Sequence, residues 1–167
     1  TTYAAYNDGR QFAKGQYFDF ADYADADELA QAARELYSDE PDPEFMITDY
    51  EDFPREWYSE SGLPDDRTFG LIKGYSDADD DDREMIDAFL SLRSEHWDDW
   101  DSLEEAARDA YQGHFKSDED FAYDLAESMG MLSGVNEDFA RYFDYAAFAR
   151  DLMMGDYSSA DGHYFRD

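Results

Sequence analysis

Closely spaced aspartates are the first side chains of this chain that could do chemistry. Positions 77–82 read Asp-Ala-Asp-Asp-Asp-Asp. Asp77, Asp79 and Asp81 have the spacing of the first three ligands of an EF-hand calcium loop. The sixth position of such a loop requires Gly and the twelfth requires Glu, whereas this chain has Asp82 and Ala88 there. We therefore expect weak, nonspecific cation association at this run and no dedicated metal site.

The three histidines are the next candidates for metal binding or general-base chemistry. His96, His114 and His163 belong to no HExxH motif, and no two of them have a helical spacing that would let them share a metal. His96 lies beside Trp97 and Trp100 in the sequence, which favours a partly buried structural role. The chain has no cysteine, so thiolate zinc sites, disulfides and cysteine nucleophiles are excluded.

Enzymatic function is the less favoured interpretation of this sequence. The nucleophile-elbow, dinucleotide-binding and P-loop patterns do not occur. A pair of carboxylates could catalyse glycoside hydrolysis. However, a chain with 44 acidic residues contains such pairs in any arrangement, so their presence does not indicate a glycosidase. We predict a protein that is not an enzyme, with no catalytic residue, no bound metal and no cofactor.

The net charge limits the partners that the chain can have. Its 167 residues include 44 acidic and 13 basic side chains, which gives a formal net charge of −31. Phosphate binding needs a cationic face, so we expect no nucleic-acid binding and no binding to an anionic membrane. Acidic disordered chains contain few aromatic residues, whereas 18% of this chain is Phe, Trp or Tyr. We therefore expect a folded protein.

The charge density approaches that of DNA within a factor of about three. A folded chain of 19.4 kDa exposes roughly 8,500 Å², or about one net charge per 270 Å². A DNA duplex has about one charge per 110 Å² of its cylinder. Repulsion among so many like charges lowers the stability of the folded state, so the excess of acidic residues requires an explanation. Two explanations stay open: adaptation to high salt, and a surface built to meet a basic DNA-binding partner.

The cellular compartment is predicted from what the sequence lacks. The absence of cysteine suits a reducing cytosol. No apolar run approaches the roughly 20 residues of a membrane span, and the first ten residues do not have the pattern of a signal peptide. We predict a cytoplasmic protein.

Residues 1–60 are predicted to form a β-rich domain with one helix. Aromatic residues, Phe12 among them, flank a turn signal and indicate two strands joined around residues 7–10. The apolar spacing in 27–37 predicts a helix whose N-terminus is favoured by Asp25. A third strand is expected at 45–48, after the break at residues 41–43.

Residues 61–109 are predicted to form an acidic helical domain. Apolar positions in 69–75 indicate one helix, and a second opens at 79–82. Ser102 is expected to cap a third helix that runs to Arg108. Between positions 77 and 109 there are 14 acidic residues against three arginines, so this stretch is the most DNA-like part of the chain.

Residues 110–167 are predicted to form a mixed domain. A strand is expected at 111–116, then a helix capped by Ser117 with an apolar stripe of Phe121, Leu125 and Met129. A second helix, 145–154, should be capped by Asp144 and stabilised by a staple between Phe143 and Phe148. A C-terminal hairpin should turn at 161–162. The fold class is therefore α+β, with three small domains.

The last third also resembles a known family. Residues 142–152, with the sequence YFDYAAFARDL, resemble the signature segment of the ArdA antirestriction proteins. Residues 121–130 resemble the helix that precedes it in that family, and residues 6–9 and 47–51 are similar to earlier family segments in the same order. The resemblance covers nearly the whole chain, although the middle third matches mainly in acidity.

The resemblance implies a function, a fold and partners. ArdA proteins are DNA mimics encoded on mobile genetic elements, and they bind type I restriction–modification enzymes in the DNA groove. The family fold is an elongated chain of three small domains, usually dimeric, so a homodimer is expected. Two alternatives stay open: a halophilic acidic enzyme or binding module, and a DNA mimic aimed at another DNA-binding protein.

Two sets of residues are the predicted site. For the signature segment, a structural or dimer-forming role is favoured, with Tyr142 and Phe143 expected to pack, and direct contact with the restriction enzyme is the alternative. That segment set is Tyr142, Phe143, Asp144, Tyr145, Phe148, Arg150, Asp151 and Leu152. The predicted partner-binding acidic surface is Asp77, Asp79, Asp80, Asp81, Asp82, Glu84, Asp87, Glu95, Asp98, Asp99, Asp101, Glu104, Glu105, Asp109, Asp118, Glu119 and Asp120.

Overall fold

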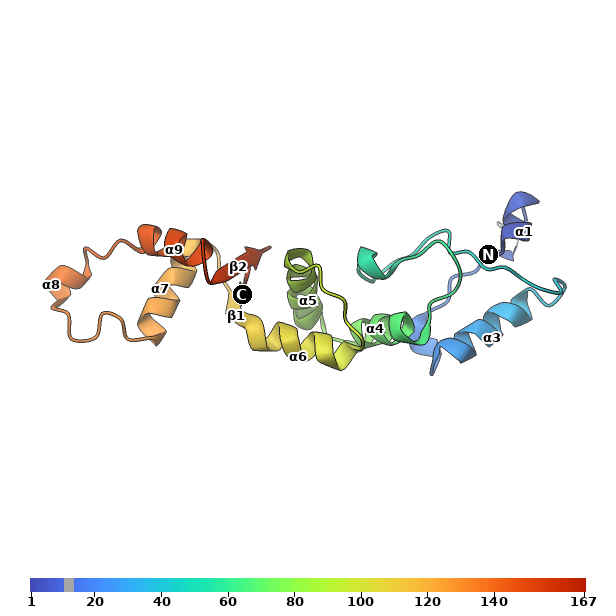
Figure 1. The fold of residues 1–167 in the computed structure, drawn as a ribbon, viewed down its shortest axis with the longest axis horizontal. Coiled ribbons are helices and arrows are strands. Elements are labelled where there is room, and N and C mark those ends of the chain that lie inside the picture. Colours follow the sequence, from blue (N-terminus) through green and yellow to red (C-terminus); the bar gives the residue numbers. More distant parts are fainter. Residues whose placement is uncertain (11–13) are drawn as a thin grey trace. The chain divides into compact units, whose positions relative to one another are not determined.

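The structure is a computed structural model that describes residues 1–10 and 14–167 (Figure 1). The predicted strand that would include Phe12 lies partly outside these residues. The described chain forms two compact units, which we call unit 1 (residues 1–80 and 97–103) and unit 2 (residues 81–96 and 104–167). The mixed α+β class is confirmed, with eight α-helices and one three-stranded antiparallel sheet in the described part. The three-domain division stays a prediction.

Unit 1 begins with helix α1, Tyr3–Asn7, where the sequence predicts a strand. The reason is a cap: the Oγ1 of the buried Thr2 accepts a hydrogen bond from the Ala5 amide at 3.1 Å. The strand predicted at 45–48 is also not formed, because Phe45 and Met46 make only isolated bridges, to Thr2 and Ser61. At α1 the local cap outweighs the strand propensity of the aromatic residues.

Short helices supply the core of unit 1. They are η1 (Phe20–Asp22), α3 (Ala26–Leu36), η2 (Arg55–Trp57) and α4 (Asp66–Asp77). Ala26, Leu29 and Phe69 are buried together, with Phe18, Phe20 and Tyr23 packed against them. Asp25 caps α3 as predicted, because its carboxylate accepts from the Glu28 amide at 2.8 Å. Asp65 caps α4 in the same way, accepting from the Thr68 amide at 2.8 Å. Those hydrogen bonds lower the pKa of Asp65.

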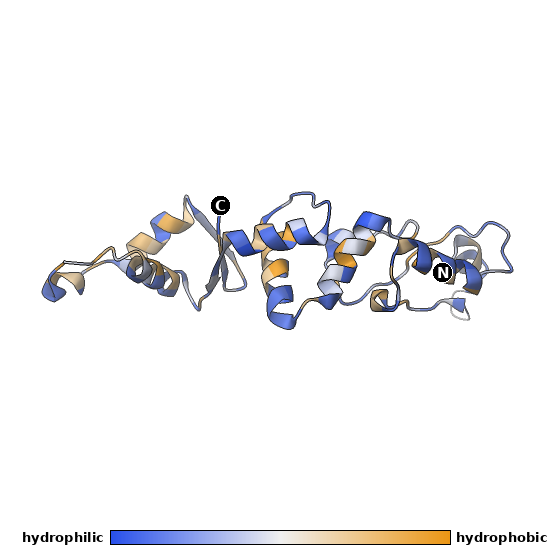
Figure 2. Cartoon of the chain, turned by 90° about the horizontal axis from the view of Figure 1, so that it is seen from below, coloured by the Kyte–Doolittle hydropathy of each residue, from blue (hydrophilic) through white to orange (hydrophobic). Residues whose placement is uncertain are grey.

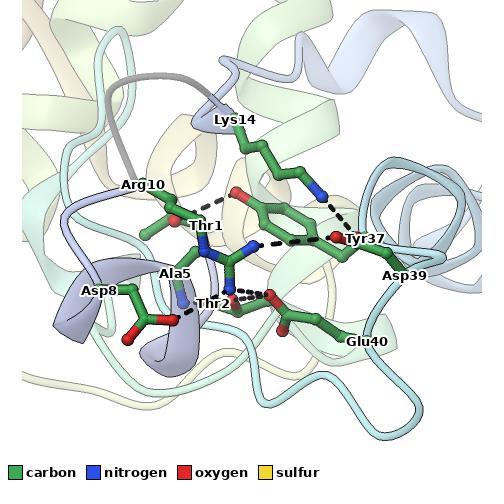
Figure 3. A network of polar contacts seen from close by, with 9 residues as sticks. All are labelled: Thr1, Thr2, Ala5, Asp8, Arg10, Lys14, Tyr37, Asp39 and Glu40. Carbon is green, nitrogen blue, oxygen red and sulfur yellow. Dashed lines mark hydrogen bonds and ion pairs between the residues drawn. The ribbon is translucent and has the colours of Figure 1, made fainter.

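A polar network joins the start of unit 1 to the turn after α3 (Figure 3). Arg10 lies 3.3 Å from Glu40 and 3.8 Å from Asp39, and Lys14 also binds Asp39. The Lys14 hydrogen bond is the main cause that lowers the pKa of Asp39. Thr2 donates to Glu40 at 3.2 Å. Two of the 13 basic residues therefore hold local structure here.

Unit 2 contains the sheet, which forms as the sequence predicts. Strands β1 (Tyr111–His114), β2 (Tyr157–Ala160) and β3 (His163–Arg166) pair in the order β1-β3-β2. Asp161 and Gly162 have φ values of 50° and 83°, so both occupy the left-handed region that a two-residue type I′ hairpin requires. The first strand ends at His114, two residues before the predicted end.

The helices of unit 2 carry most of the predicted site. They are α5 (Asp80–Leu92), α6 (Trp100–Ala110, whose first four residues belong to unit 1), α7 (Asp118–Ser128), α8 (Glu137–Ala140) and α9 (Tyr145–Met153). Hydrophilic and hydrophobic positions alternate along them (Figure 2). Within the described ranges, every helix is too short or too polar to cross a membrane.

Two predictions about these helices are wrong. Ser102 does not cap α6, because its amide donates to the Asp99 carboxylate at 2.8 Å, which makes Asp99 the capping residue. Met129 does not extend the apolar stripe of Phe121, because α7 ends at Ser128 and Met129 is 66% exposed.

A buried histidine lies at the hairpin. The Nδ1 of His163 is 3.0 Å from the Tyr111 hydroxyl, and its ring centroid is 4.8 Å from that of His114. Burial and then the charge of His114 lower the pKa of His163 below its usual 6.5, while Glu84 and Asp161 act in the opposite direction. The folded chain therefore disfavours the protonated form of this ring.

We expect the free energy of unfolding to fall as the pH drops from 7.5 to 5.5. The unfolded chain takes up a proton on His163 near pH 6.5, whereas the folded chain resists it, so acid favours unfolding. Urea denaturation at several pH values measures this dependence. His163→Gln should flatten it, and a change at the exposed His96, His96→Gln, should leave it unchanged. An equally steep dependence in His163→Gln would contradict the assignment.

Candidate partner-binding surface

The acidic positions of α5 lie opposite its buried face. Met85, Ile86 and Phe89 are at most 4% exposed. Asp80, Glu84 and Asp87 follow the spacing i, i+4, i+7, which puts them on one helical face, and all three are exposed. The helix is thus amphipathic, and burial of its apolar side turns a row of carboxylates outward. Such a row can attract a cationic surface.

The aspartate run at 77–82 does not form a calcium loop. Helix α4 ends at Asp77 and α5 begins at Asp80, so the run is divided between two helices and a two-residue connection. Within residues 1–10 and 14–167, no group of three or more His, Asp or Glu side chains is arranged to hold a metal ion. Four carboxylates of the run, Asp77, Asp79, Asp80 and Asp81, are exposed to solvent.

The predicted acidic surface is distributed over both units. Asp98 and Asp101 are exposed near the start of α6, and Asp99 between them is its cap. The hydrogen bonds from Ser102 lower the pKa of Asp99, so this carboxylate keeps its charge while it holds the helix end. Unit 1 contains Asp77, Asp79, Asp80, Asp98, Asp99 and Asp101; unit 2 contains Asp81, Asp82, Glu84, Asp87, Glu95, Glu104, Glu105, Asp109, Asp118, Glu119 and Asp120.

One arginine contacts two acids of the predicted surface. Arg108 of α6 lies 2.6 Å from Asp82 of α5 and 2.9 Å from Glu104, one turn earlier on its own helix. The hydrogen bond to Glu104 is the main cause that raises the pKa of Arg108. Sequence reasoning missed this contact, because only the i, i+4 pair of Arg108 with Glu104 is visible in the sequence.

A third acidic group begins α7. Asp118, Glu119 and Asp120 are exposed in its first turn, and the Ser117 hydroxyl accepts from the Asp120 amide at 3.1 Å, as predicted. Tyr164 of β3 donates to Asp118 at 2.6 Å. Burial, and then this bond, raises the pKa of Tyr164 to about 12. The sheet thus holds one carboxylate of the group in place.

Several side chains of the signature segment make local contacts in unit 2. Asp144 caps α9, accepting from the Ala147 amide at 2.9 Å, and the rings of Phe143 and Phe148 lie 5.6 Å apart, which confirms the predicted cap and staple. Tyr145 packs against Tyr123 of α7 with ring centroids 5.1 Å apart. Tyr142 differs from its prediction, because it is 74% exposed.

The remaining signature residues divide between the two faces of α9. Arg150 and Asp151 are exposed, and Leu152 is half-buried. Ala149 is 3% exposed and lies on the same face as Leu152. The face with Arg150 and Asp151 is therefore turned to solvent, while the opposite face packs within unit 2.

Removing the cap of α9 should lower the stability of unit 2. We expect Asp144→Ala to reduce the free energy of unfolding by about 1 kcal/mol, because the Ala147 amide loses its acceptor. Asp151→Ala, at an exposed position of the same helix, is the matched control and should change stability by less than about 0.5 kcal/mol. Urea denaturation measures both. Equal effects would mean that charge, and not the cap, matters at Asp144.

Exposed apolar side chains near the signature segment were not predicted. Met129, Phe139 and Met154 are 66%, 72% and 85% exposed. Together with Tyr142, they are the exposed apolar side chains of unit 2 considered below. The sequence does contain a signal, because residues 129–136 include no charged side chain in a chain that is otherwise dense in acids.

Comparison with known proteins agrees with these features. The family model described as antirestriction protein (ArdA) matches residues 1–166. Searches of curated proteins and of solved structures found no match. Because the family match extends over essentially the entire sequence, this chain belongs to the ArdA family of antirestriction proteins.

Proposed function

We propose that this protein is a DNA mimic that inhibits type I restriction–modification enzymes by occupying their DNA-binding groove. The observation that carries the proposal is the family match over residues 1–166 in a chain with a net charge of −31. Family membership implies an antirestriction function. The charge supplies the physical means, since a restriction enzyme must bind phosphates with cationic side chains.

The arrangement of acids supports mimicry. Carboxylates on α5, α6 and α7 are exposed in rows that a cationic groove could contact in place of phosphates. Both partners would release counterions, so association should be fast and should weaken steeply as salt rises. The protein acts without catalysis, in the cytoplasm, where incoming DNA meets the restriction enzyme.

The test is DNA cleavage by a purified type I enzyme with increasing amounts of this protein near 0.1 M salt. We expect stoichiometric inhibition that excess DNA relieves. If cleavage is unaffected while circular dichroism shows a folded protein, the target is wrong. Pull-downs would then test other DNA-binding proteins, and folding that requires molar salt would favour the halophilic alternative.

The active form is proposed to be a homodimer joined through these exposed apolar side chains of unit 2. They lie in a part of the chain with low net charge, because residues 129–154 contain four acids and two arginines. Two copies of such an acidic chain repel least where this charge is low. A dimer would have about 62 net charges, equivalent to roughly 30 base pairs at one charge per ~1.7 Å.

We expect Phe139→Ser combined with Tyr142→Ser to convert the dimer to a monomer. Both side chains are exposed in the described chain, at 72% and 74%, so their loss should cost little folding stability. Sedimentation velocity measures the mass, and exposed Tyr17→Ser in unit 1 is the control. A wild-type monomer at micromolar concentration would contradict the dimer, and an intact dimer in the double variant would contradict this interface.

A further inference from the structure

Two acidic helical segments lie close together in unit 2. The part of α5 in this unit contains Asp81, Asp82, Glu84 and Asp87, and the part of α6 contains Glu104, Glu105 and Asp109. Like charges on neighbouring helices repel, and the repulsion grows as the surfaces approach. A cation placed between the two segments would reduce this repulsion.

Arg108 is placed to do so. Its Nη2 atom lies 2.6 Å from Asp82 Oδ2 and 2.9 Å from Glu104 Oε1, so one guanidinium bridges carboxylates of both helices. The Nε atom donates to the same Glu104 oxygen at 3.0 Å. The guanidinium belongs to α6 and reaches to α5, so its positive charge lies between carboxylates of the two helices.

We propose that Arg108 is a positioning residue that sets the spacing between the carboxylate rows of α5 and α6, and thereby the fit of this surface to a basic partner. The inference rests on the proposed function, because the spacing of the carboxylates affects inhibition only if a partner binds to them. Arg108 itself need not touch that partner.

The proposal and simple charge attraction predict opposite effects for Arg108→Gln. This substitution makes the net charge more negative, from −31 to −32, and added negative charge should strengthen attraction to a cationic groove. If Arg108 positions the acids, the same change should weaken inhibition despite the extra charge. The sign of the effect therefore distinguishes positioning from attraction.

The experiment compares three variants in the type I cleavage assay at 0.1 M salt. We expect Arg108→Gln to need about three- to fivefold more protein for half-inhibition, the range of an exposed ion pair. Arg108→Lys keeps a positive charge that can lie between Asp82 and Glu104, so it should stay within about twofold of wild type. Arg34→Gln, at an exposed position in the last turn of α3, adds the same charge and should not weaken inhibition.

A distance measurement gives a readout that a loss of stability would not reproduce. Because the chain lacks cysteine, Ser91→Cys on α5 and Glu105→Cys on α6 provide two unique exposed spin-label sites within unit 2. Pulsed electron resonance on the doubly labelled protein should give a broader or longer distance with Arg108→Gln, and the original distance with Arg108→Lys. Thermal melts of all variants identify any that unfold.

Each outcome is decisive. Weaker inhibition with a changed distance in Arg108→Gln, both restored in Arg108→Lys, supports the proposal. Inhibition that is unchanged or stronger, or weaker inhibition with an unchanged distance, overturns it. If Arg108→Gln unfolds, Arg108→Lys provides the test. A wild-type distance together with wild-type potency in Arg108→Lys supports the proposal, whereas reduced potency at the wild-type distance overturns it. Failure of wild-type protein to inhibit overturns the proposed function instead.

Discussion

Neutralising the acids around the start of α5 should weaken inhibition of a type I restriction enzyme at least about fivefold. Single exposed ion pairs are each worth about 0.2–1 kcal/mol, so one substitution should do little, while five together should sum to 1 kcal/mol or more. The salt dependence should also become less steep, because fewer counterions are released. The variant replaces Asp79, Asp80, Asp81 and Asp82 with Asn and Glu84 with Gln.

The choice of substitution protects the fold. Asn caps a helix N-terminus about as well as Asp does, so the first turn of α5 should still form. Loss of five negative charges also relieves self-repulsion. Because Asp82 binds Arg108, a second variant that keeps Asp82 separates loss of attraction from loss of that bridge. Half-inhibitory concentrations at 0.05, 0.1 and 0.2 M salt measure both effects.

A control with the same total charge tests whether position matters. It neutralises five exposed acids of unit 1 that lie outside the predicted surface: Asp42, Glu44, Glu51, Glu56 and Glu60. We expect this variant to keep more of its potency than the α5 variant. An equal loss would mean that only net charge counts, and full potency of the α5 variant would remove the start of α5 from the interface.

Gly74→Ala should destabilise unit 1 by about 2 kcal/mol, although Ala normally stabilises a helix interior. A methyl group at Gly74 would overlap Trp100 Cγ and lie 2.6 Å from its Cβ. Since Cβ is part of the Trp100 attachment to the backbone, the ring cannot turn away without moving the start of α6. Overpacking costs about 1–3 kcal/mol, and so close an approach to the ring should lie at the upper end of that range. Subtracting the roughly 1 kcal/mol gained in helix propensity leaves the net loss of about 2 kcal/mol.

The same helix offers the matched control. A methyl group at Gly70 of α4 would have no atom within 4 Å, so Gly70→Ala should stabilise the protein by about 0.5–1 kcal/mol. Thermal unfolding measures both changes, at about 2–4 °C per kcal/mol for a chain of this size. Opposite shifts at two glycines of one helix would establish the contact with Trp100, and equal shifts would contradict it.

Much of the secondary structure could be predicted because its signals are local. Ser117 and Asp144 cap the helices that follow them, and the dipeptide at 161–162 turns the hairpin. Each of these depends on contacts within four residues, so the sequence alone contains the information. The Asp144 cap and the contact between Phe143 and Phe148 are local in the same way, since both join residues around the start of α9.

Predictions failed where the outcome depends on distant neighbours or on competing local signals. Tyr3 and Tyr6 have strand-forming character, yet the cap at Thr2 makes a helix of them, and Thr2 itself bonds to Glu40 across 38 residues. Asp99 took the capping role predicted for Ser102, because both are good caps three residues apart. Tyr142 has an aromatic ring that usually packs, but no neighbouring element covers most of it.

By itself, the sequence determined the net charge, the family and the amphipathic helices, because these follow from composition and short-range pattern. Tertiary structure decided which acids turn outward, which arginine bridges α5 to α6, and where apolar side chains stay exposed. These features depend on the packing of segments far apart in the chain. Composition predicts attraction to a basic partner, whereas the spacing of the carboxylates exists only in the folded protein.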